Sequence, residues 1–290
     1  MTTQATSALS TPPQPQEAES YARGSSFYTA MRIMPPSQRQ AMYEIYHFCR
    51  AVDDIADEEG DIAMRRAALQ IWRDDIAALY QPSGTHAETS PNYLGLAQAI
   101  KTFNLRKEDF VAVIDGMQMD LDGPIVAPDL ATLMMYCDRV ACAVGRLSAC
   151  VFGLKPDDGI ELAHHLGNAL QLTNILRDID EDAAIGRIYL PREYLDEAGI
   201  HTSDISAIIT HPNLPVVCDR LAQMGKAHFA KANEVMLRYP HKIVRTPRVM
   251  SEAYRAIFDA VTLRGFTSPR APIKLNKFKL AIIVLKNLIA

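Results

Sequence analysis

Four polar side chains share one face of a predicted helix near residue 50, and two of them are carboxylates one turn apart. Tyr46, Arg50, Asp53 and Asp57 occupy relative positions 0, 4, 7 and 11. At about 100° of rotation per residue, these positions fall within an arc of roughly 60°. The rest of the segment is apolar, so this face must meet either solvent or a polar cavity.

A second polar face of the same kind occurs far along the chain. Gln171, Asn174, Asp178 and Asp182 occupy relative positions 0, 3, 7 and 11, within an arc of roughly 80°. Paired acids on a single helix are usually solvated surface. Two such faces, each on an otherwise apolar helix, instead favour a shared polar cavity.

Four carboxylates that meet in one cavity need compensation, because like charges repel at close range and burial raises the cost. Mg²⁺ suits such a site, since it takes oxygen ligands, keeps several waters and is often completed by substrate phosphates. The two faces therefore predict an enzyme that binds a diphosphate through Mg²⁺ between two helices.

Composition narrows the class of protein. The chain has 290 residues, of which 48% are hydrophobic, enough for one large core. The net charge of -4 creates no field that favours nucleic acid, so no nucleic-acid partner is expected. Five cysteines without a CxxC pair are typical of reduced, buried thiols in the cytosol. We expect a cytoplasmic protein; composition leaves its oligomeric state open.

Helical periodicity dominates the chain, and no run shows the sustained alternation of strands. The pattern predicts one all-α domain over residues 21–290, with a cavity between its helices, after a disordered leader at residues 1–20 that lacks Lys and Arg. The predicted helices span residues 25–33, 37–57, 61–80, 93–103, 107–121, 129–152, 158–182, 191–198, 215–238, 249–266 and 274–289.

The C-terminal segment, residues 273–290, combines lysines with an apolar run. Two interpretations remain open: an ordinary last helix packed on the core, or a helix that lies on an anionic membrane surface. The second would place the protein peripherally on the inner face of the membrane. No run of 18 or more uncharged apolar residues occurs, so no spanning segment is predicted.

A di-iron site is the rival metal hypothesis. Glu44 and His47, and likewise Glu161 and His164, have the Glu-x-x-His spacing of di-iron helical bundles. Glu44, however, lies roughly 160° around its helix from Tyr46, away from the aspartates. His164 shares the face of Gln171 and Asp178, so it is expected either to line the cavity or to serve as a structural residue.

Several motifs, in this order, resemble those of the squalene/phytoene synthase family. They are Phe27-Tyr28, FCRAVDDIAD at residues 48–57, DGMQMD at 115–120, YCDRVACAVG at 136–145, QLTNILRDIDED at 171–182 and GRIYLP at 186–191. The resemblance runs from about residue 22 to about residue 270. It implies an all-α isoprenoid synthase fold with a central active-site cavity.

The resemblance also implies roles for individual residues. The family's two aspartate-rich motifs correspond to Asp53 with Asp57 and to Asp178 with Asp182, and Asn174 joins them as a metal ligand. Asp54 is assigned a supporting role, because it lies off the polar face. Diphosphate-binding residues are Arg50, Arg187 and Tyr189. The central cavity is implied to be lined by Tyr46, Tyr136 and Gln171, with Phe27, Val140 and Val144 beside the prenyl chains.

The implied reaction is a Mg²⁺-dependent, head-to-head condensation of two farnesyl diphosphates. Within the family, residues 178–192 are most similar to the bacterial branch that forms presqualene diphosphate for hopanoid biosynthesis, so NADPH is not expected. Three alternatives stay open: condensation of two geranylgeranyl diphosphates to phytoene, complete squalene synthesis with NADPH, and a non-catalytic assembly factor that retains the fold. The general base is not assigned; Tyr46, Tyr136 and the released diphosphate are all candidates.

Overall fold

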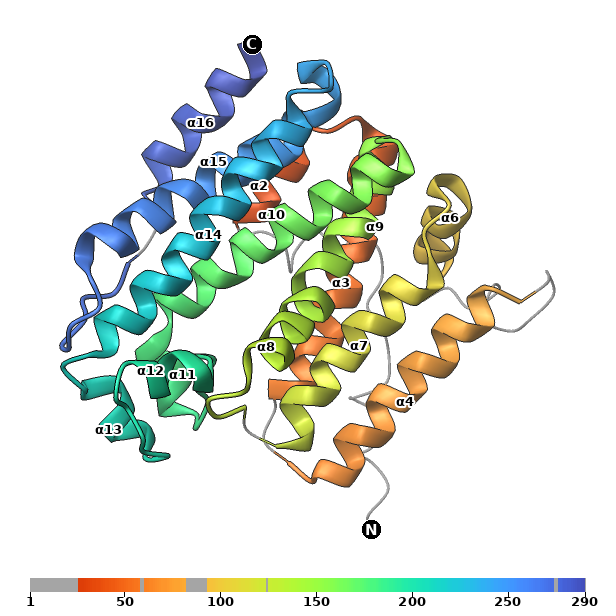
Figure 1. The fold of residues 1–290 in the computed structure, drawn as a ribbon. Helices are drawn as coiled ribbons and strands as arrows, with labels where there is room; N and C mark the ends of the chain where they lie inside the picture. The colour runs from red at the N-terminus through yellow and green to blue at the C-terminus, as the bar shows by residue number, and fades with distance from the viewer. Residues whose placement is uncertain (1–25, 58–59, 82–92, 124, 274–275, 290) are drawn as a thin grey trace.

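The computed structural model describes residues 26–57, 60–81, 93–123, 125–273 and 276–289. Nearly all of its regular structure is helical, as the sequence predicts (Figure 1). The predicted leader at residues 1–20 lies outside the described residues, as does the side chain of Phe27.

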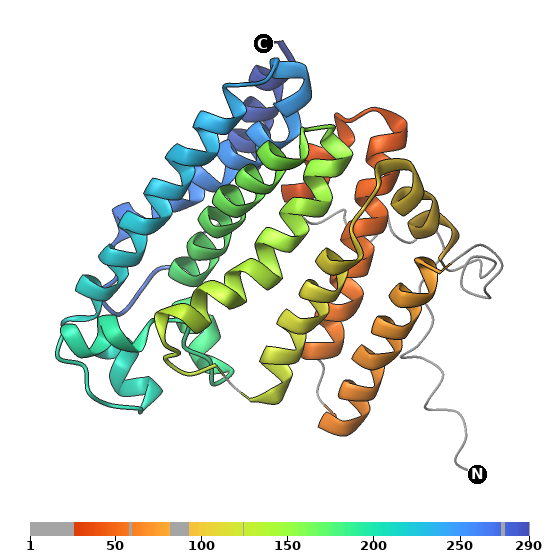
Figure 2. The ribbon, with the colours of Figure 1, turned by 45° about the vertical axis from the view of Figure 1, so that its right-hand side comes forward.

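Long helices lie side by side, and short helices gather at one end of the bundle (Figures 1 and 2). The elements are α2 (Ser26–Arg32), α3 (Pro36–Asp57), α4 (Ile62–Leu79), α6 (Leu94–Phe103), α7 (Lys107–Asp122), α8 (Leu130–Cys137), the π-helix η1 (Asp138–Cys142), α9 (Ala143–Phe152), α10 (Pro156–Arg177), α11 (Ile179–Ala184), α12 (Arg192–Glu197), α13 (Ile205–Thr210), α14 (Leu214–Met236), α15 (His241–Arg264) and α16 (Lys277–Ile289).

Two large hydrophobic clusters form the core. One joins α3, α4, α6, α7 and α9, and the other joins α8, α10, α14 and α15. Val140 of η1 packs against both clusters. The layer formed by η1, α9 and α10 therefore lies between the two halves of the core.

A π-helical turn interrupts the segment predicted as one helix over residues 129–152. Such a turn inserts one residue per turn without ending the helix, so side-chain periodicity does not reveal it. The neighbouring helices approach η1 closely at glycines. A Cβ on Gly167 would lie 2.8 Å from Cα of Cys142, and one on Gly116 would lie 2.6 Å from Cγ1 of Val140.

The helix predicted over residues 158–182 is in fact two helices. α10 ends at Arg177, and Asp178, with φ of −101° and ψ of 20°, separates it from α11. One turn of hydrogen bonding still spans the break, because the Asp182 amide donates to the Asp178 carbonyl at 2.8 Å. The ideal helical rotation used to place Asp182 therefore holds only approximately.

One further helix begins earlier than predicted, and one short helix was not predicted at all. α15 begins at His241 rather than at residue 249, and Pro247 lies inside it. Proline usually ends a helix, but Pro247 is buried against the central cavity, where packing offsets the lost hydrogen bond. The six-residue helix α13 was not predicted; it is short, and the side chain of Asp204 caps it by accepting from the Ser206 amide at 3.0 Å.

The last helix, α16, packs by one face and exposes another apolar face. Ile283 is buried in a small cluster with Ala30 of α2 and Val249 of α15. On the other side, exposed apolar residues recur along the helix: Phe278, Ile282, Leu285 and Ile289. The structure thus confirms that the last helix packs on the rest of the fold, and contact with a membrane stays a prediction.

No helix among the described residues is both long and apolar enough to cross a membrane.

Candidate active site

A largely apolar cavity of about 270 Å³ lies between the two halves of the core. The helices α3, η1, α9, α10 and α15 supply its walls. Tyr46, Gln171 and Asn174 are the polar residues near one end, and Val140 and Val144 line its side. Met42, Phe152 and Leu162 lie farther from the aspartates along their helices. Most of its polar residues thus lie toward one end; Ser148 of α9 also lines the cavity, and its hydroxyl donates to the Val144 carbonyl at 2.8 Å.

A second, more polar hollow continues from that end. It shares Tyr46, Val140, Val144 and Gln171 with the apolar cavity. Arg50, Asp53 and Tyr136 also line it. The sequence predicted these residues for one site, and in the structure they line two adjoining hollows.

At the C-terminal end of α3, Arg50 holds two neighbouring carboxylates. Its guanidinium donates to Asp53 at 2.9 Å and contacts Asp54 at 2.6 Å. Burial, followed by the negative charge of Asp57, raises the pKa of Asp53 to about 6, although Arg50 opposes the shift. The carboxylates of α3 are thus only partly compensated by the protein.

At the end of α10, Arg177 binds Asp178 through two hydrogen bonds of 2.6 and 2.5 Å. Burial and then the charge of Asp178 raise the pKa of Asp182 to about 7, while Arg187 lowers it. Arg177 had no predicted role. Its position directly before Asp178 was visible in the sequence, but a helical wheel places adjacent residues on different faces.

The segment around Arg187 joins the two acidic regions. Its guanidinium contacts the Asp57 carboxylate at 3.3 Å, and its backbone amide donates to the Asp182 carbonyl at 2.8 Å. A short parallel β-bridge between Val126 and Ile188 holds the segment in place. Ile188 and Tyr189 are both buried in one hydrophobic cluster, whereas the side chain of Arg187 is directed toward Asp57.

Asp120 of α7 is the centre of a hydrogen-bonded group that was not predicted. The hydroxyls of Tyr136 and Tyr189 each donate to one of its carboxylate oxygens at 2.9 Å. The two phenol rings stack with centroids 4.9 Å apart. The charge of Asp120 contributes to the raised pKa of both Asp53 and Asp182, so it lies near both acidic regions.

One signal in the sequence could have identified Asp120. It follows Gly116 by four residues, so the two share a face of α7. Gly116 permits the close approach of η1, and Asp120 on the same face is directed toward Tyr136. Burial raises the pKa of Asp120, while Arg187 and the two tyrosines oppose that shift.

The donor set fits a hard divalent cation. Its members are carboxylates and an amide oxygen, which Mg²⁺ prefers. The Asn174 Oδ1 atom is buried without a hydrogen-bond partner among the described residues. Mutual repulsion contributes to the raised pKa of Asp53 and Asp182, and a bound cation would relieve it. Among the described residues, no three of these carboxylates lie within 4.8 Å of one another, so water and phosphate oxygens would complete the coordination.

The di-iron hypothesis is not supported by the structure. Glu44 is buried, accepts a hydrogen bond from Gln40 at 2.7 Å and packs against Gly95 of α6. Glu161 instead forms an ion pair with Arg238 at 2.6 Å. The two glutamates therefore serve different parts of the fold.

The suggestion that His164 lines the cavity is wrong. His164 is exposed and lies in a cluster with two other histidines. A helical wheel places it on the face of Gln171, but the cavity is lined instead by Ala163, Leu166 and Gly167. The wall of the cavity is set by which side of α10 meets η1, and that contact is tertiary.

Comparison with known proteins places this site in a family. The family model for squalene/phytoene synthase matches residues 21–279. The chain is 53% identical over 273 residues to the presqualene diphosphate synthase of Rhodopseudomonas palustris, covering 94% of this chain and 96% of that one. It is 54% identical to the protein of the same name from Sinorhizobium fredii, covering 91% and 93%.

More distant relatives agree with this assignment. A phytoene synthase of Cereibacter sphaeroides is 29% identical, covering 84% of this chain and 72% of that protein. The crystal structure of a dehydrosqualene synthase in complex with a ligand superposes with a TM-score of 0.81 at 23% identity, covering 94% and 95% of the two chains, and so shares the fold. With two acidic helix ends flanking an apolar cavity and a family match over most of its length, the chain belongs to the squalene/phytoene synthase family.

Proposed function

We propose that this protein condenses two farnesyl diphosphates head to head, forming presqualene diphosphate and releasing one diphosphate. The observation that carries the proposal is identity of 51–54% to three proteins named presqualene diphosphate synthase, over more than nine-tenths of the chain. The phytoene synthase of Cereibacter sphaeroides is much less similar, at 29%. An apolar cavity that opens into an acidic, arginine-containing region is consistent with a substrate of this class.

We assign Mg²⁺ to the oxygen donors at the ends of α3 and α10. They are Asp53, Asp57, Asn174, Asp178 and Asp182. When bound, the ions would neutralise the charge that develops on the departing diphosphate. Arg50 and Arg187 lie beside these donors. Their planar guanidinium groups suit bidentate contact with phosphate oxygens, so we assign them to diphosphate binding.

The apolar cavity would bind the prenyl chains and exclude water from the allylic cation. Val140 and Val144 lie where both parts of the site meet, beside Tyr46 and Gln171. Aromatic faces and oriented dipoles stabilise a carbocation without reacting with it as water would. The C2–C3 double bond of the second farnesyl group attacks this cation, and loss of a proton closes the cyclopropane ring.

Of the three candidates for the proton acceptor, Tyr136 is the one that its surroundings argue against; Tyr46 and the released diphosphate remain. Burial and the neighbouring Asp120 raise the pKa of Tyr136 well above 10, so it remains a phenol. Its hydroxyl already donates to Asp120 at 2.9 Å. A neutral phenol is a weak base. We therefore assign Tyr136 to positioning Asp120 and shaping the cavity, and not to proton abstraction.

Product analysis tests the proposed reaction. The purified protein is given farnesyl and geranylgeranyl diphosphates together with Mg²⁺, with and without NADPH, and products are identified by mass spectrometry. Presqualene diphosphate in both conditions is the expected result. Phytoene would refute the assignment of substrate, and squalene formed only with NADPH would refute the assignment of product. An inactive protein that still binds a farnesyl thiodiphosphate would favour the assembly-factor alternative.

We also propose that α16 rests on an anionic membrane surface. The exposed residues Phe278, Ile282, Leu285 and Ile289 occupy relative positions 0, 4, 7 and 11, a single helical stripe. Lys279 and Lys286 lie on the same helix. An exposed apolar stripe with flanking lysines is the pattern of helices that lie in the membrane interface. It would keep the enzyme near the membrane into which its hydrophobic products partition.

Vesicle sedimentation tests this contact without disturbing the packed face of α16. The double substitution Phe278→Ser and Ile282→Ser should abolish co-sedimentation with vesicles rich in phosphatidylglycerol. The matched control is Val216→Ser, which removes an exposed apolar residue from α14. Equal sedimentation of the double variant and the wild type would refute the proposal.

A further inference from the structure

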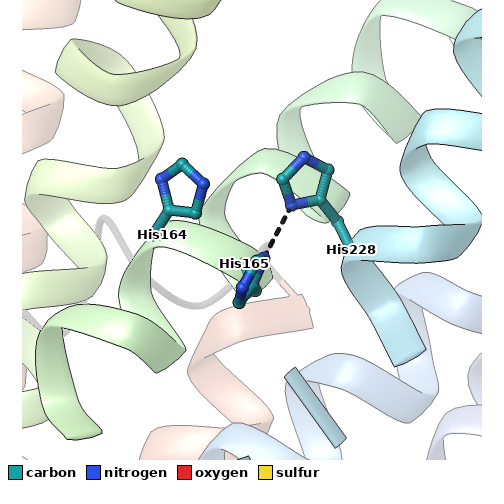
Figure 3. A group of neighbouring side chains, drawn as sticks. All are labelled: His164, His165 and His228. Carbon is teal, nitrogen blue, oxygen red and sulfur yellow. Dashed lines mark hydrogen bonds between the residues drawn. The ribbon is translucent and has the colours of Figure 1, made fainter. Parts of the chain in front are cut away.

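Three histidines meet on the surface between α10 and α14, well away from the aspartates. His164 and His165 are consecutive residues of α10, and His228 comes from α14. Figure 3 shows the three imidazole rings near one another, with His165 and His228 joined by a hydrogen bond and His164 beside them. A nitrogen from each ring lies within 4.8 Å of a nitrogen of the others. Asn174, the nearest of the proposed Mg²⁺ ligands along α10, is about 15 Å farther along the helix axis.

The spacing of the rings is that of metal ligands. The Nδ1 atoms of His165 and His228 are joined by a hydrogen bond of 3.0 Å, and a metal ion bound to both would displace the proton between them. Two imidazole nitrogens bound to one transition-metal ion at about 2.0–2.1 Å lie roughly 2.9–3.4 Å apart, depending on the coordination angle. The centroid of the His164 ring is 4.9 Å from that of the His165 ring and 5.5 Å from that of the His228 ring. His164 is exposed, and one of its ring nitrogens lies within 4.8 Å of a nitrogen of each of the other two rings.

The protonation state of the cluster also suits a metal. Burial, and then the neighbouring imidazoles, lower the pKa of His228 to about 4 and lower that of His165 as well. Neutral imidazole is the form that coordinates metal ions. Of the charged groups that face His165, Glu161 and Glu234 are negative and Lys231 is positive. Both glutamates are engaged, Glu161 by Arg238 at 2.6 Å and Glu234 by Lys231 at 2.9 Å.

A competing donor set shares His164 but is less suitable. It would combine His164 with Asp138 and Cys142. Asp138 is already paired with Arg146 at 2.8 Å. Burial raises the pKa of the Cys142 thiol to about 12, so it is not a thiolate at neutral pH. Of these two donor sets, found among the described residues, the three histidines are the more suitable, because none of them is paired with an arginine.

We propose that His164, His165 and His228 form a binding site for a divalent transition-metal ion of the Zn²⁺ class, which fastens α10 to α14. Three imidazole ligands favour Zn²⁺, Ni²⁺ or Cu²⁺ over Mg²⁺, which prefers oxygen. His164 lies at the edge of a surface hollow, and a water molecule would be expected as the fourth ligand of such an ion. The ion would stabilise the helix that carries Gln171 and Asn174 to the active site, without contact with the substrate.

Zinc binding to the intact protein tests the site. Calorimetric titration with Zn²⁺ in excess Mg²⁺, followed by elemental analysis after dialysis, should give one equivalent more for the wild type than for His228→Gln or His165→Gln. Affinity at this site should fall about tenfold or more, because even loss of an outer-shell partner costs that much. The control His201→Gln removes an exposed histidine outside the cluster and should bind as the wild type does.

The variant Asp178→Asn tests whether the additional zinc ion binds at the aspartates instead. It should retain the additional zinc equivalent, because Asp178 is outside the histidine cluster. Circular dichroism and thermal melting without metal establish that each variant is folded. If His228→Gln does not fold, His165→Gln alone carries the test. Zinc should raise the melting temperature of the wild type and of His201→Gln, but not of the cluster variants. Equal zinc stoichiometry and affinity in the wild type and both cluster variants would overturn the proposal, as would the absence of zinc binding to the wild type.

Discussion

Replacing Asp182 by asparagine should stabilise the metal-free protein while abolishing its activity. Burial and the charges of Asp178 and Asp120 raise the pKa of Asp182 to about 7, against roughly 3.9 in an unfolded chain. A shift of about three units corresponds to about 4 kcal/mol at high pH. Because the residue is partly exposed, solvent screening reduces this, and we expect about 2 kcal/mol.

The sign of the effect depends on pH. Below about pH 4 the carboxyl is protonated in both states, so the substitution should change stability little. As the pH rises toward 7, the unfolded chain releases the proton while the folded protein retains it, and the wild type loses stability. Asp182→Asn has no such loss. Its advantage should therefore grow with pH and level off above about pH 7.

Thermal melting in EDTA at several pH values measures this difference. At about pH 8 we expect a melting temperature about 4 °C above that of the wild type. Mg²⁺ with a farnesyl thiodiphosphate should reverse the order, because a ligand stabilises only the protein that binds it. The control Asp219→Asn removes one negative charge from the exposed surface of α14 and should show neither effect. A variant that melts no higher than the wild type in EDTA, yet responds fully to Mg²⁺, would refute the placement of Asp182 among the repelling carboxylates.

Three further substitutions test separate parts of the site. Phe152 lines the cavity about 12 Å along α9 from Val144. Phe152→Ala should enlarge the cavity there and raise kcat/KM for geranylgeranyl diphosphate relative to farnesyl diphosphate about tenfold or more. An unchanged ratio in competition assays would show that Phe152 does not limit chain length. Tyr136→Phe removes a donor to Asp120 and should lower kcat less than about 100-fold, since loss of a general base costs at least that much; a larger loss, with a changed pH profile, would assign the base to Tyr136. Gly167→Ala adds a Cβ 2.8 Å from the backbone of Cys142 and should destabilise the fold by about 1–3 kcal/mol, which melting curves will detect; an unchanged melting temperature would contradict the close contact of α10 with η1.

Much of the proposed metal site was accessible from the sequence because its residues are arranged by local rules. The spacing of Asp53 and Asp57, and that of Asn174 and Asp178, places each pair on one helical face whatever the rest of the chain does. Apolar periodicity likewise predicted an all-α domain and most of its long helices, which the structure confirms. The carboxylates were recognised because an acidic pair on an apolar helix conflicts with simple burial.

Tertiary structure decided which distant groups meet. Asp120 lies off the polar stripe of its own helix, which Glu108, Asp115 and Asp122 form, yet it accepts hydrogen bonds from Tyr136 and Tyr189, which are distant in sequence. Arg187 contacts Asp57, 130 residues earlier in the chain, next to a β-bridge that joins Ile188 to Val126 in the segment after α7. His164 follows the helical wheel of the aspartates but faces away from the cavity, beside His228 of α14.

The same division explains the errors in the predicted helices. Rotation per residue is a local property, so it shows which side chains share a face of one helix. The π-turn at η1 and the break at Asp178 change that rotation, but they leave little trace in the pattern of apolar residues. Which face of α10 becomes cavity wall depends on the glycine contact between Gly167 and Cys142. The polar and apolar faces of a helix are determined by residues close together in the chain. The helix against which each face packs is determined by contacts between segments far apart in the sequence.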